Sequence, residues 1–309
     1  MALPPAPLRL GTRGSPLALA QARMTAAALI ARHGWPEDAI RTVIVQTSGD
    51  RIQDRPLADI GGKALWTKEL DRALTSGEID FAVHSMKDVE TDRPADIAIA
   101  AMLPRADVRD RLVGAASLAA LPDRPVVGTS SPRRAAQVRR ARPDASIILF
   151  RGNVATRLAK LEQGFAHATL LAAAGLDRLG QGDVGHAVEP DEMLPAPAQG
   201  AVGIETLAAN RDMMGWLAAI SDADTFDCVM AERAVLRALG GTCHSPIAAL
   251  GVMDGERIHL RAEILTPDGG EVVAQAAHVA RDDPNGGLAL GEALLGRASP
   301  ALRALFAGA

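Results

Sequence analysis

Short runs of β-branched and aliphatic residues alternate with longer Ala- and Leu-rich stretches through the first two-thirds of the chain. The short runs have the length and composition of buried strands, and the longer stretches are typical of helices. We predict strands at 8–12, 40–47, 81–84 and 97–102, and helices at 15–33 and 62–76. This alternation indicates an α/β domain built on a mostly parallel, doubly wound sheet.

A second series of the same kind follows a break at 104–107. It predicts strands at 126–129, 147–150 and 169–173, and helices at 132–140 and 153–163. Both series contain a strand, a polar turn and a helix start, as Gly11-Thr12-x-x-Ser15-Pro16 and Gly128-Thr129-x-x-Pro132. We therefore expect two similar domains that present helix N-termini at the carboxyl ends of their strands, where such folds bind ligands.

The last third of the chain has a different pattern. A buried strand at 200–205 follows the linker-like Pro195-Ala196-Pro197 and could return the chain to the first domain. The pattern then predicts a helix at 226–239, antiparallel strands at 247–253, 258–265 and 271–279, and a helix at 287–297. These elements indicate a small C-terminal α+β domain. We predict domain 1 at 1–104 and 197–220, domain 2 at 105–196, and domain 3 at 221–309.

The segment 105–157 has an unusual charge. It contains 11 Arg and no Lys against 4 Asp and no Glu, in a chain whose formal net charge is −4. Ser131 is a candidate helix N-cap, and Arg133 and Arg134 in the first turn oppose the helix dipole unless an anion is bound there. The alternative is a solvated basic helix face. Arg151 and Arg157 follow the next strand at the same sheet edge, which favours the anion site.

Two further residues could carry chemistry. The strand at 81–84 ends in a polar turn with Asp88, whose carboxylate stays ionised near cations and could stabilise positive charge or transfer protons. A salt-bridged surface turn is the alternative. Cys243 lies in a Gly-rich loop, where it could be a nucleophile or a covalent attachment point. A buried structural thiol, as expected for Cys228 inside a helix, is the alternative.

Composition argues against several classes of protein. Two Cys are too few for a disulfide framework. The seven His are scattered and lack the spacing of metal ligands, so we expect no structural metal site. No apolar run approaches the roughly 18 residues of a membrane span, and the N-terminus lacks a signal-peptide pattern, so we expect a cytoplasmic protein. The net charge of −4 and the aromatic content of 3% argue against nucleic-acid binding.

Seven motifs follow one another between the N-terminus and Pro246. They are Leu10-Gly11-Thr12-Arg13-Gly14-Ser15-Pro16-Leu17-Ala18, Gly61-Gly62-Lys63-Ala64-Leu65-Trp66-Thr67-Lys68-Glu69-Leu70, His84-Ser85-Met86-Lys87-Asp88, Gly128-Thr129-Ser130-Ser131-Pro132-Arg133-Arg134, Arg151-Gly152-Asn153-Val154-x-Thr156-Arg157, Ala173-Ala174-Gly175-Leu176-x-Arg178-Leu179, and Pro197-Ala198-Gln199-Gly200-Ala201-Val202-Gly203-Ile204-Glu205. In number and order they resemble the motifs of porphobilinogen deaminases, also called hydroxymethylbilane synthases.

The resemblance implies a transferase of tetrapyrrole biosynthesis with lobes like those of periplasmic binding proteins. It would join four porphobilinogen molecules into linear hydroxymethylbilane, releasing ammonia, from a dipyrromethane cofactor attached to a Cys. The resemblance further implies a monomer that binds no metal, membrane or nucleic acid and passes its product to uroporphyrinogen-III synthase. Because each pyrrole carries an acetate and a propionate, arginine forks and helix N-termini suit these ligands.

The family's functional positions match particular residues of this chain. Asp88 matches the catalytic carboxylate, and Cys243 matches the attachment point, although Thr242 stands where the family usually has Gly. The resemblance implies that the substrate is bound by Arg13, Arg151, Arg157 and Arg178. It implies that the cofactor is bound by Cys243, Arg13, Ser15, Lys63, Ser85, Lys87, Asp88, Thr129, Ser131, Arg133, Arg134, Arg151, Gly152, Asn153 and Gln199.

The main rival is a non-enzymatic anion-binding protein with the two-domain architecture of periplasmic receptors. It explains the arginines and the helix N-termini equally well. It does not require Asp88 or Cys243, and the signal segment that export needs was not found in the sequence.

Overall fold

The computed structural model describes residues 4, 6–46, 67–241, 245–281, 283 and 285–306. These residues form two compact units. The first contains the described residues up to 46 together with 67–106 and 201–226, and the second contains 107–200 and the described residues from 227 onward. No described helix is long and apolar enough to cross a membrane.

The first unit is built on a five-stranded sheet with the order β2-β1-β3-β10-β4. Its strands are β1 (Leu8–Thr12), β2 (Ile40–Ile44), β3 (Phe81–Ser85), β4 (Ile97–Met102) and β10 (Val202–Leu207). Its helices are α1 (Pro16–His33), α3 (Lys68–Thr75) and α7 (Arg211–Ala218), with short 3₁₀ turns η1 (Glu37–Ala39) and η3 (Met86–Asp88). Only β10 runs against the other four strands.

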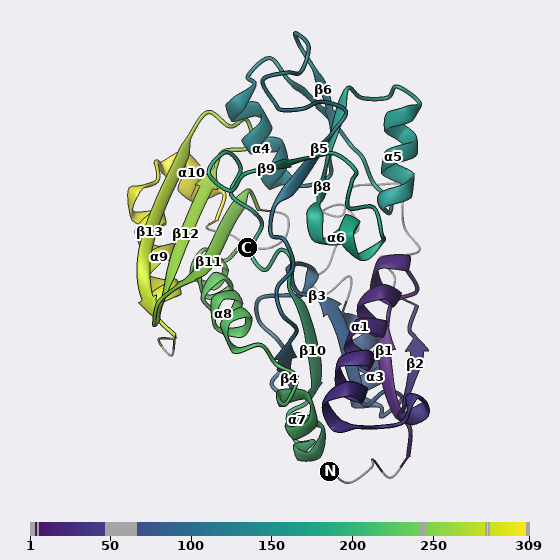
Figure 1. Ribbon diagram of the computed structural model, residues 1–309. Helices are drawn as coiled ribbons and strands as arrows, with labels where there is room; N and C mark the ends of the chain where they lie inside the picture. The colour runs from purple at the N-terminus through teal and green to yellow at the C-terminus, as the bar shows by residue number, and fades with distance from the viewer. Residues whose placement is uncertain are drawn as a thin grey trace. The chain divides into compact units, whose positions relative to one another are not determined.

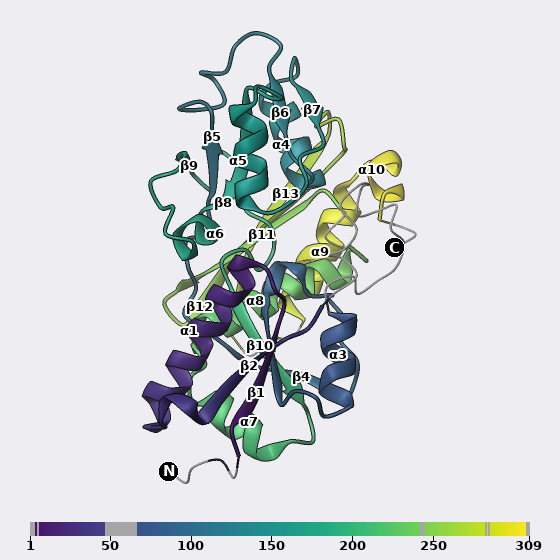
Figure 2. The same cartoon turned by 90° about the vertical axis from the view of Figure 1, so that its right-hand side faces the viewer.

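Helices cover both faces of this sheet, as Figures 1 and 2 show. Leu29 of α1 and Met213 of α7 share one core with Leu10 of β1, whereas Leu70 of α3 packs in another core with Ala82 of β3. The start of α1 is set as the sequence predicts, since the Ser15 hydroxyl accepts a hydrogen bond from the Ala18 amide at 3.2 Å. The carboxyl ends of the parallel strands β1 and β3 therefore lie near the N-terminus of α1.

The second unit contains another five-stranded sheet, with the order β7-β6-β8-β5-β9. Its elements are β5 (Asp110–Val113), β6 (Val126–Gly128), β7 (Ser146–Ile148), β8 (Ala168–Ala172), β9 (His186–Val188), α4 (Pro132–Ala141), α5 (Val154–Glu162) and α6 (Ala173–Arg178). Only β5 is antiparallel to its neighbours. In both sheets the single reversed strand therefore occupies the fourth position, which confirms the prediction of two similar, mostly parallel α/β sheets.

The C-terminal part of the second unit has its own sheet, β11-β12-β13, with every pairing antiparallel. Its elements are β11 (Ile247–Asp254), β12 (Arg257–Leu265), β13 (Val272–Ala280), α8 (Ala223–Ala238), α9 (Gly286–Arg297) and α10 (Pro300–Ala304). Val235, Leu260 and Leu294 lie in its hydrophobic core. The α+β prediction for this region is confirmed, whereas the domain boundaries given above stay a prediction.

Several elements differ from the sequence prediction. Strands β5 and β9 and helices α6 and α7 were not predicted, because they are short and their polar residues interrupt the apolar pattern. The strand predicted at 147–150 ends at Ile148. Phe150 then turns inward, where a Cβ at Gly128 would come within 2.5 Å of its ring. The predicted elements at 40–47 and 62–76 lie partly outside the described residues, which show β2 ending at Ile44 and α3 beginning at Lys68.

Candidate functional site

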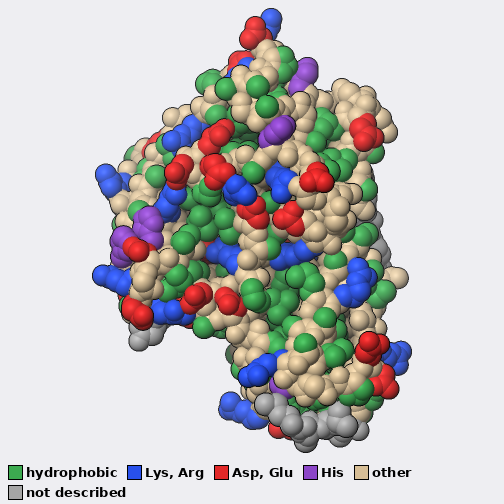
Figure 3. Space-filling model, viewed as in Figure 1, with side chains coloured by type: hydrophobic (Ala, Val, Ile, Leu, Met, Phe, Trp, Pro, Cys, Tyr) green, Lys and Arg blue, Asp and Glu red, His purple; other side chains and the backbone are tan. Residues whose placement is uncertain are grey.

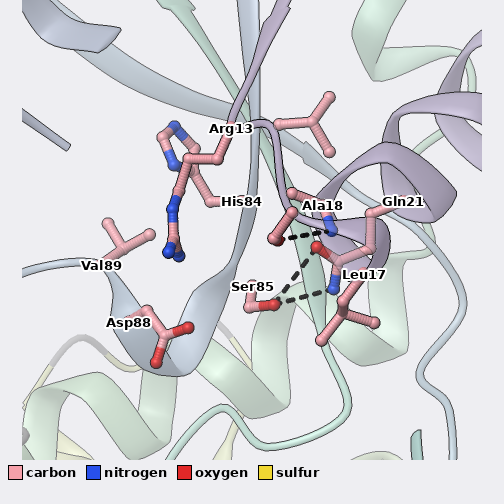
Figure 4. Close-up of a pocket in the computed structure, with 10 residues that line it drawn as sticks. Arg13, Leu17, Ala18, Gln21, His84, Ser85, Asp88 and Val89 are labelled. Atoms are coloured by element: carbon pink, nitrogen blue, oxygen red, sulfur yellow. Dashed lines mark hydrogen bonds between the residues drawn. The ribbon is translucent and has the colours of Figure 1, made fainter. Parts of the chain in front are cut away.

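A pocket in the first unit brings together four of the residues predicted for the site. Asp88 closes the η3 turn directly after β3 and lines this pocket with Arg13, Ser15 and Ser85 (Figure 4). The guanidinium of Arg13 and the carboxylate of Asp88 lie on the same side of the pocket in that view. An anionic ligand could therefore be bound by Arg13 while Asp88 faces positive charge on the same molecule.

The pocket also contains a polar residue that the sequence did not suggest. The Gln21 amide donates a hydrogen bond to the Ser85 hydroxyl at 2.8 Å, and Gln21 itself is only 2% exposed. It lies on α1, whereas Ser85 ends β3. A lone Gln in an Ala-rich helix has no local signal, so only the packing of α1 on the sheet reveals it.

A buried ion network lies behind the strand that carries Asp88. Glu205 of β10 is fully buried, with its carboxylate 2.8 Å from Nε of Arg93 and 3.1 Å from Nε2 of His84. Burial acts to raise the pKa of Glu205, but His84 and Arg93 outweigh it and lower this pKa to about 2. Because the folded pKa lies below the ordinary value of 4.5, this group stabilises the fold above that pH. The contribution is lost as the pH falls through about 2.

A second group of predicted residues gathers at one edge of the sheet in the second unit. The parallel strands β6 and β7 end side by side there, and each is followed by a helix. The Ser131 hydroxyl accepts the Arg134 amide at 3.4 Å, so the predicted N-cap is confirmed. The Asn153 side chain caps α5 by accepting the Thr156 amide at 2.9 Å. Two helix N-termini therefore point their amides toward this edge, an arrangement that suits carboxylates.

Arg151 lies at this edge, three residues after the end of β7. Its Nη1 atom is buried and has no hydrogen-bond partner in the described part of the chain. A buried guanidinium N–H without an acceptor is costly, so a ligand oxygen would satisfy it. Arg157 bonds instead to the Gly152 carbonyl at 3.0 Å, which holds its guanidinium over the same turn. The donors at this edge are therefore suited to the carboxylate groups of a ligand.

Arg133 and Arg134 have an anionic partner inside their own domain. Their Nη2 atoms lie 2.8 and 2.6 Å from the two carboxylate oxygens of Asp110 on β5. Gln199 donates to the same carboxylate at 2.9 Å. Burial acts to raise the pKa of Asp110, but the two guanidinium groups outweigh it and keep that pKa far below its usual range. The anion that the first turn of α4 requires is therefore supplied by the chain, and ligand contacts of these arginines stay a prediction.

Other arginines of the basic segment are also paired. Arg109 lies 2.8 Å from Asp107 and 2.6 Å from Glu189, and Arg142 lies 2.8 Å from Asp144. On the face drawn in Figure 3, acidic and basic side chains are interspersed. The excess of Arg therefore does not make a continuous basic patch on that face.

The remaining predicted residues have separate settings. Arg178 ends α6, where it donates to the Gly200 carbonyl at 2.7 Å and burial lowers its pKa. Lys87 lies in the η3 turn, and Thr129 comes directly after β6. Lys63 and Cys243 lie outside the described residues. In the described ranges, no group of three or more His, Cys, Asp or Glu side chains could hold a metal ion.

Comparison with known proteins identifies the family. The family model of the porphobilinogen deaminase dipyromethane cofactor binding domain matches residues 8–215, and that of the C-terminal domain matches 226–296. The chain is 55% identical over 313 residues to the porphobilinogen deaminase of Sphingopyxis alaskensis, covering 99% of both chains. It is 53% identical over 299 residues to that of Paracoccus denitrificans, covering 96% of both. The chain belongs to the porphobilinogen deaminase family.

Membership in this family confirms the predicted activity. The chain is a transferase that joins porphobilinogen units into hydroxymethylbilane in tetrapyrrole biosynthesis, with a dipyrromethane cofactor. This result favours the enzyme over a non-catalytic anion-binding protein. The individual roles of the site residues, including attachment of the cofactor to Cys243, stay predictions.

Two solved structures of other proteins have a much lower similarity to this chain. The second substrate binding domain of a putative amino acid ABC transporter from Streptococcus pneumoniae has a TM-score of 0.42 at 14% identity, covering 75% of this chain and 94% of that chain. A periplasmic His/Glu/Gln/Arg/opine family-binding protein from Silicibacter pomeroyi has a TM-score of 0.37 at 18% identity, covering 74% and 93%. The α/β class given above comes from the strand order of the chain itself.

The burial of Asp110 generates a prediction about stability. Asp110→Asn removes the anion between two buried guanidinium groups, so the free energy of unfolding should fall by about 3–5 kcal/mol. Urea denaturation followed by circular dichroism measures this change. The matched control is Asp191→Asn, because Asp191 pairs with Arg261 at 2.6 Å but is largely exposed. Equal losses in the two variants would contradict a buried, structurally required carboxylate.

Proposed function

We propose that this chain uses Asp88 as its catalytic carboxylate and Cys243 as the attachment point of its cofactor. The observation that carries the first assignment is the position of Asp88 in the turn that follows a buried strand, in one pocket with Arg13 and Ser15. A carboxylate held there by the backbone is preorganised to face positive charge. The support for Cys243 is the family resemblance of the surrounding loop.

The chemistry requires a fixed negative charge. When porphobilinogen loses ammonia, the ring and its methylene carbon become positively charged. The half-buried Asp88 carboxylate stabilises this charge, and it accepts the proton that the attacked pyrrole α-carbon releases when the new carbon–carbon bond forms. Arg13 in the same pocket would bind a carboxylate of the incoming pyrrole, so that its methylene carbon lies near Asp88, and Ser15 would bind the cofactor.

The other predicted residues would bind the carboxylates of the pyrrole chain. Bound to Cys243, the dipyrromethane would supply the pyrrole carbon to which the first substrate unit is joined. Its acetates and propionates would be bound by the basic and hydroxyl residues that the resemblance assigns to the cofactor, Lys63 and Lys87 among them. The Asp110 carboxylate is bound by Arg133, Arg134 and Gln199. These contacts would position the start of α4, so that Ser131 and the backbone amides of the first helical turn face the ligand.

We further propose a cytoplasmic monomer that passes hydroxymethylbilane to uroporphyrinogen-III synthase. A hydroxymethyl group on an electron-rich pyrrole is readily lost as water, so the product needs an enzyme that consumes it at once. Light scattering on the purified enzyme should give the mass of one chain at all concentrations. A mass that doubles as the concentration rises would contradict the monomer.

The attachment of the cofactor can be tested by mass. The purified enzyme should be heavier than its sequence by two linked pyrrole units, and peptide mass spectrometry should place them on Cys243. The variant Cys243→Ser should have the mass of the bare chain and no activity. Cys228→Ser is the matched control and should keep both the adduct and the activity, since Cys228 lies buried in α8. An adduct on Cys228, or an active enzyme without an adduct, would overturn the assignment.

The role of Asp88 can be tested by removing only its charge. Asp88→Asn should lower kcat by about 10²–10⁴-fold, because an amide neither stabilises the cation nor accepts a proton. Asp88→Glu should retain part of the rate. The exposed Asp123→Asn serves as the control and should keep the wild-type rate. A wild-type kcat for Asp88→Asn at saturating porphobilinogen would show that the catalytic role is wrong.

A further inference from the structure

The residues on both sides of the Asp88 turn contact one buried carboxylate, that of Glu205. Oε2 of Glu205 lies 3.1 Å from Nε2 of His84, which stands four residues before Asp88. The same carboxylate accepts two hydrogen bonds from Arg93, five residues after Asp88, at 2.8 and 2.9 Å. The segment from His84 to Arg93 therefore contacts Glu205 at both of its ends, and the turn with Asp88 lies between these two contacts.

Arg93 extends the network to the neighbouring helix. Its guanidinium lies 3.0 Å from Glu90 and 2.5 Å from Asp71 of α3, and the Thr67 hydroxyl donates to Glu90 at 2.6 Å. The Arg93 side chain is 8% exposed, and those of Asp71 and Glu90 are 15% and 22% exposed, so the network is partly shielded from water. Burial also raises the pKa of Asp71. In this network three carboxylates face one guanidinium and one imidazole.

The backbone of β10 supports the same turn. In the sheet, His84 pairs with Gly203 and Ser85 pairs with Val202, and the Met86 amide then donates to the Ala201 carbonyl at 3.1 Å. A Cβ at Gly203 would lie 2.0 Å from the Met86 sulfur, so the buried Met86 uses the space that this glycine leaves. Strand β10 thus determines both the path of the turn and, through Glu205, the charge behind it.

We propose that Glu205 is a positioning residue for the reaction, which holds His84 and Arg93 so that the turn keeps the Asp88 carboxylate at the pocket. The inference rests on the catalytic role of Asp88 given under the proposed function. Glu205 itself does not line the pocket, although its partner His84 does, and its effect on the turn reaches the substrate through Asp88. A misplacement of a catalytic group by about 1 Å can cost on the order of 100-fold in rate, so a loosened turn should lower kcat.

A double-mutant cycle with Asp88 separates positioning from stability. In the wild-type background, Glu205→Gln should lower kcat for porphobilinogen at least about tenfold with little change in KM. In the Asp88→Asn background the same substitution should change kcat by less than about twofold, because no carboxylate remains to be placed. All four enzymes are compared as holoenzymes with equal cofactor content, established by intact mass.

The matched control breaks another ion pair of the same sheet. Asp80 directly precedes β3 and lies 2.7 Å from Arg9, away from the turn. Asp80→Asn should have the same effect on kcat in both Asp88 backgrounds. If Glu205→Gln does not fold, Glu205→Asp replaces it, because the shorter side chain keeps the charge but cannot reach both His84 and Arg93, and it should show the same coupling to Asp88.

The outcomes distinguish the two proposals. An equal fold-loss for Glu205→Gln, or for its replacement Glu205→Asp, in both backgrounds would overturn the positioning role and leave the catalytic role of Asp88 intact. An unchanged kcat in the wild-type background would also overturn it. A wild-type rate for Asp88→Asn alone would instead overturn the proposed function.

Discussion

Each α/β sheet of this chain contains one fully buried carboxylate on its single reversed strand, and arginines neutralise both. Glu205 on β10 pairs with Arg93, and Asp110 on β5 pairs with Arg133 and Arg134. A buried carboxylate without such partners would lower the stability of the fold by several kcal/mol. Each reversed strand must therefore pack against the helix or turn that carries its arginine partners. The reversed strand lies beside the third strand of its sheet, which continues into the turn with Asp88 in the first unit and into α6 with Arg178 in the second.

The architecture was largely predictable because it depends on local patterns. Alternating apolar runs and helical stretches identify the sheets, and Ser15-Pro16 and Ser131-Pro132 identify two helix starts. Strand β5 was missed because Asp110 and Arg111 occupy half of its four positions. Those charged residues are tolerated in a buried strand only because partners distant in sequence neutralise them, and a local pattern cannot contain this information.

The candidate site shows the same division. The strand-end motifs pointed to Asp88, Ser85 and Ser131, and the structure brings the first two together in one pocket. The sequence interpretation assigned Arg133 to an external anion, whereas its carboxylate partner lies 23 residues earlier in the chain. Gln21 and Glu205 were missed as parts of the site, since each meets its partners only after a helix packs or a strand pairs. Short-range motifs thus point to polar groups at the ends of strands and helices, but not to the residues that hold those groups in place.

On this proposal, the buried charge of Glu205 holds the Asp88 turn in place. The most direct measurement is a pair of high-resolution crystal structures, of the wild-type holoenzyme and of Glu205→Gln. The account predicts that β3 and β10 superimpose while the turn at 86–88 shifts or adopts two conformations, with the Asp88 carboxylate displaced from Arg13. An Asp88 carboxylate in the same position in both structures, with the turn unchanged, would contradict the account.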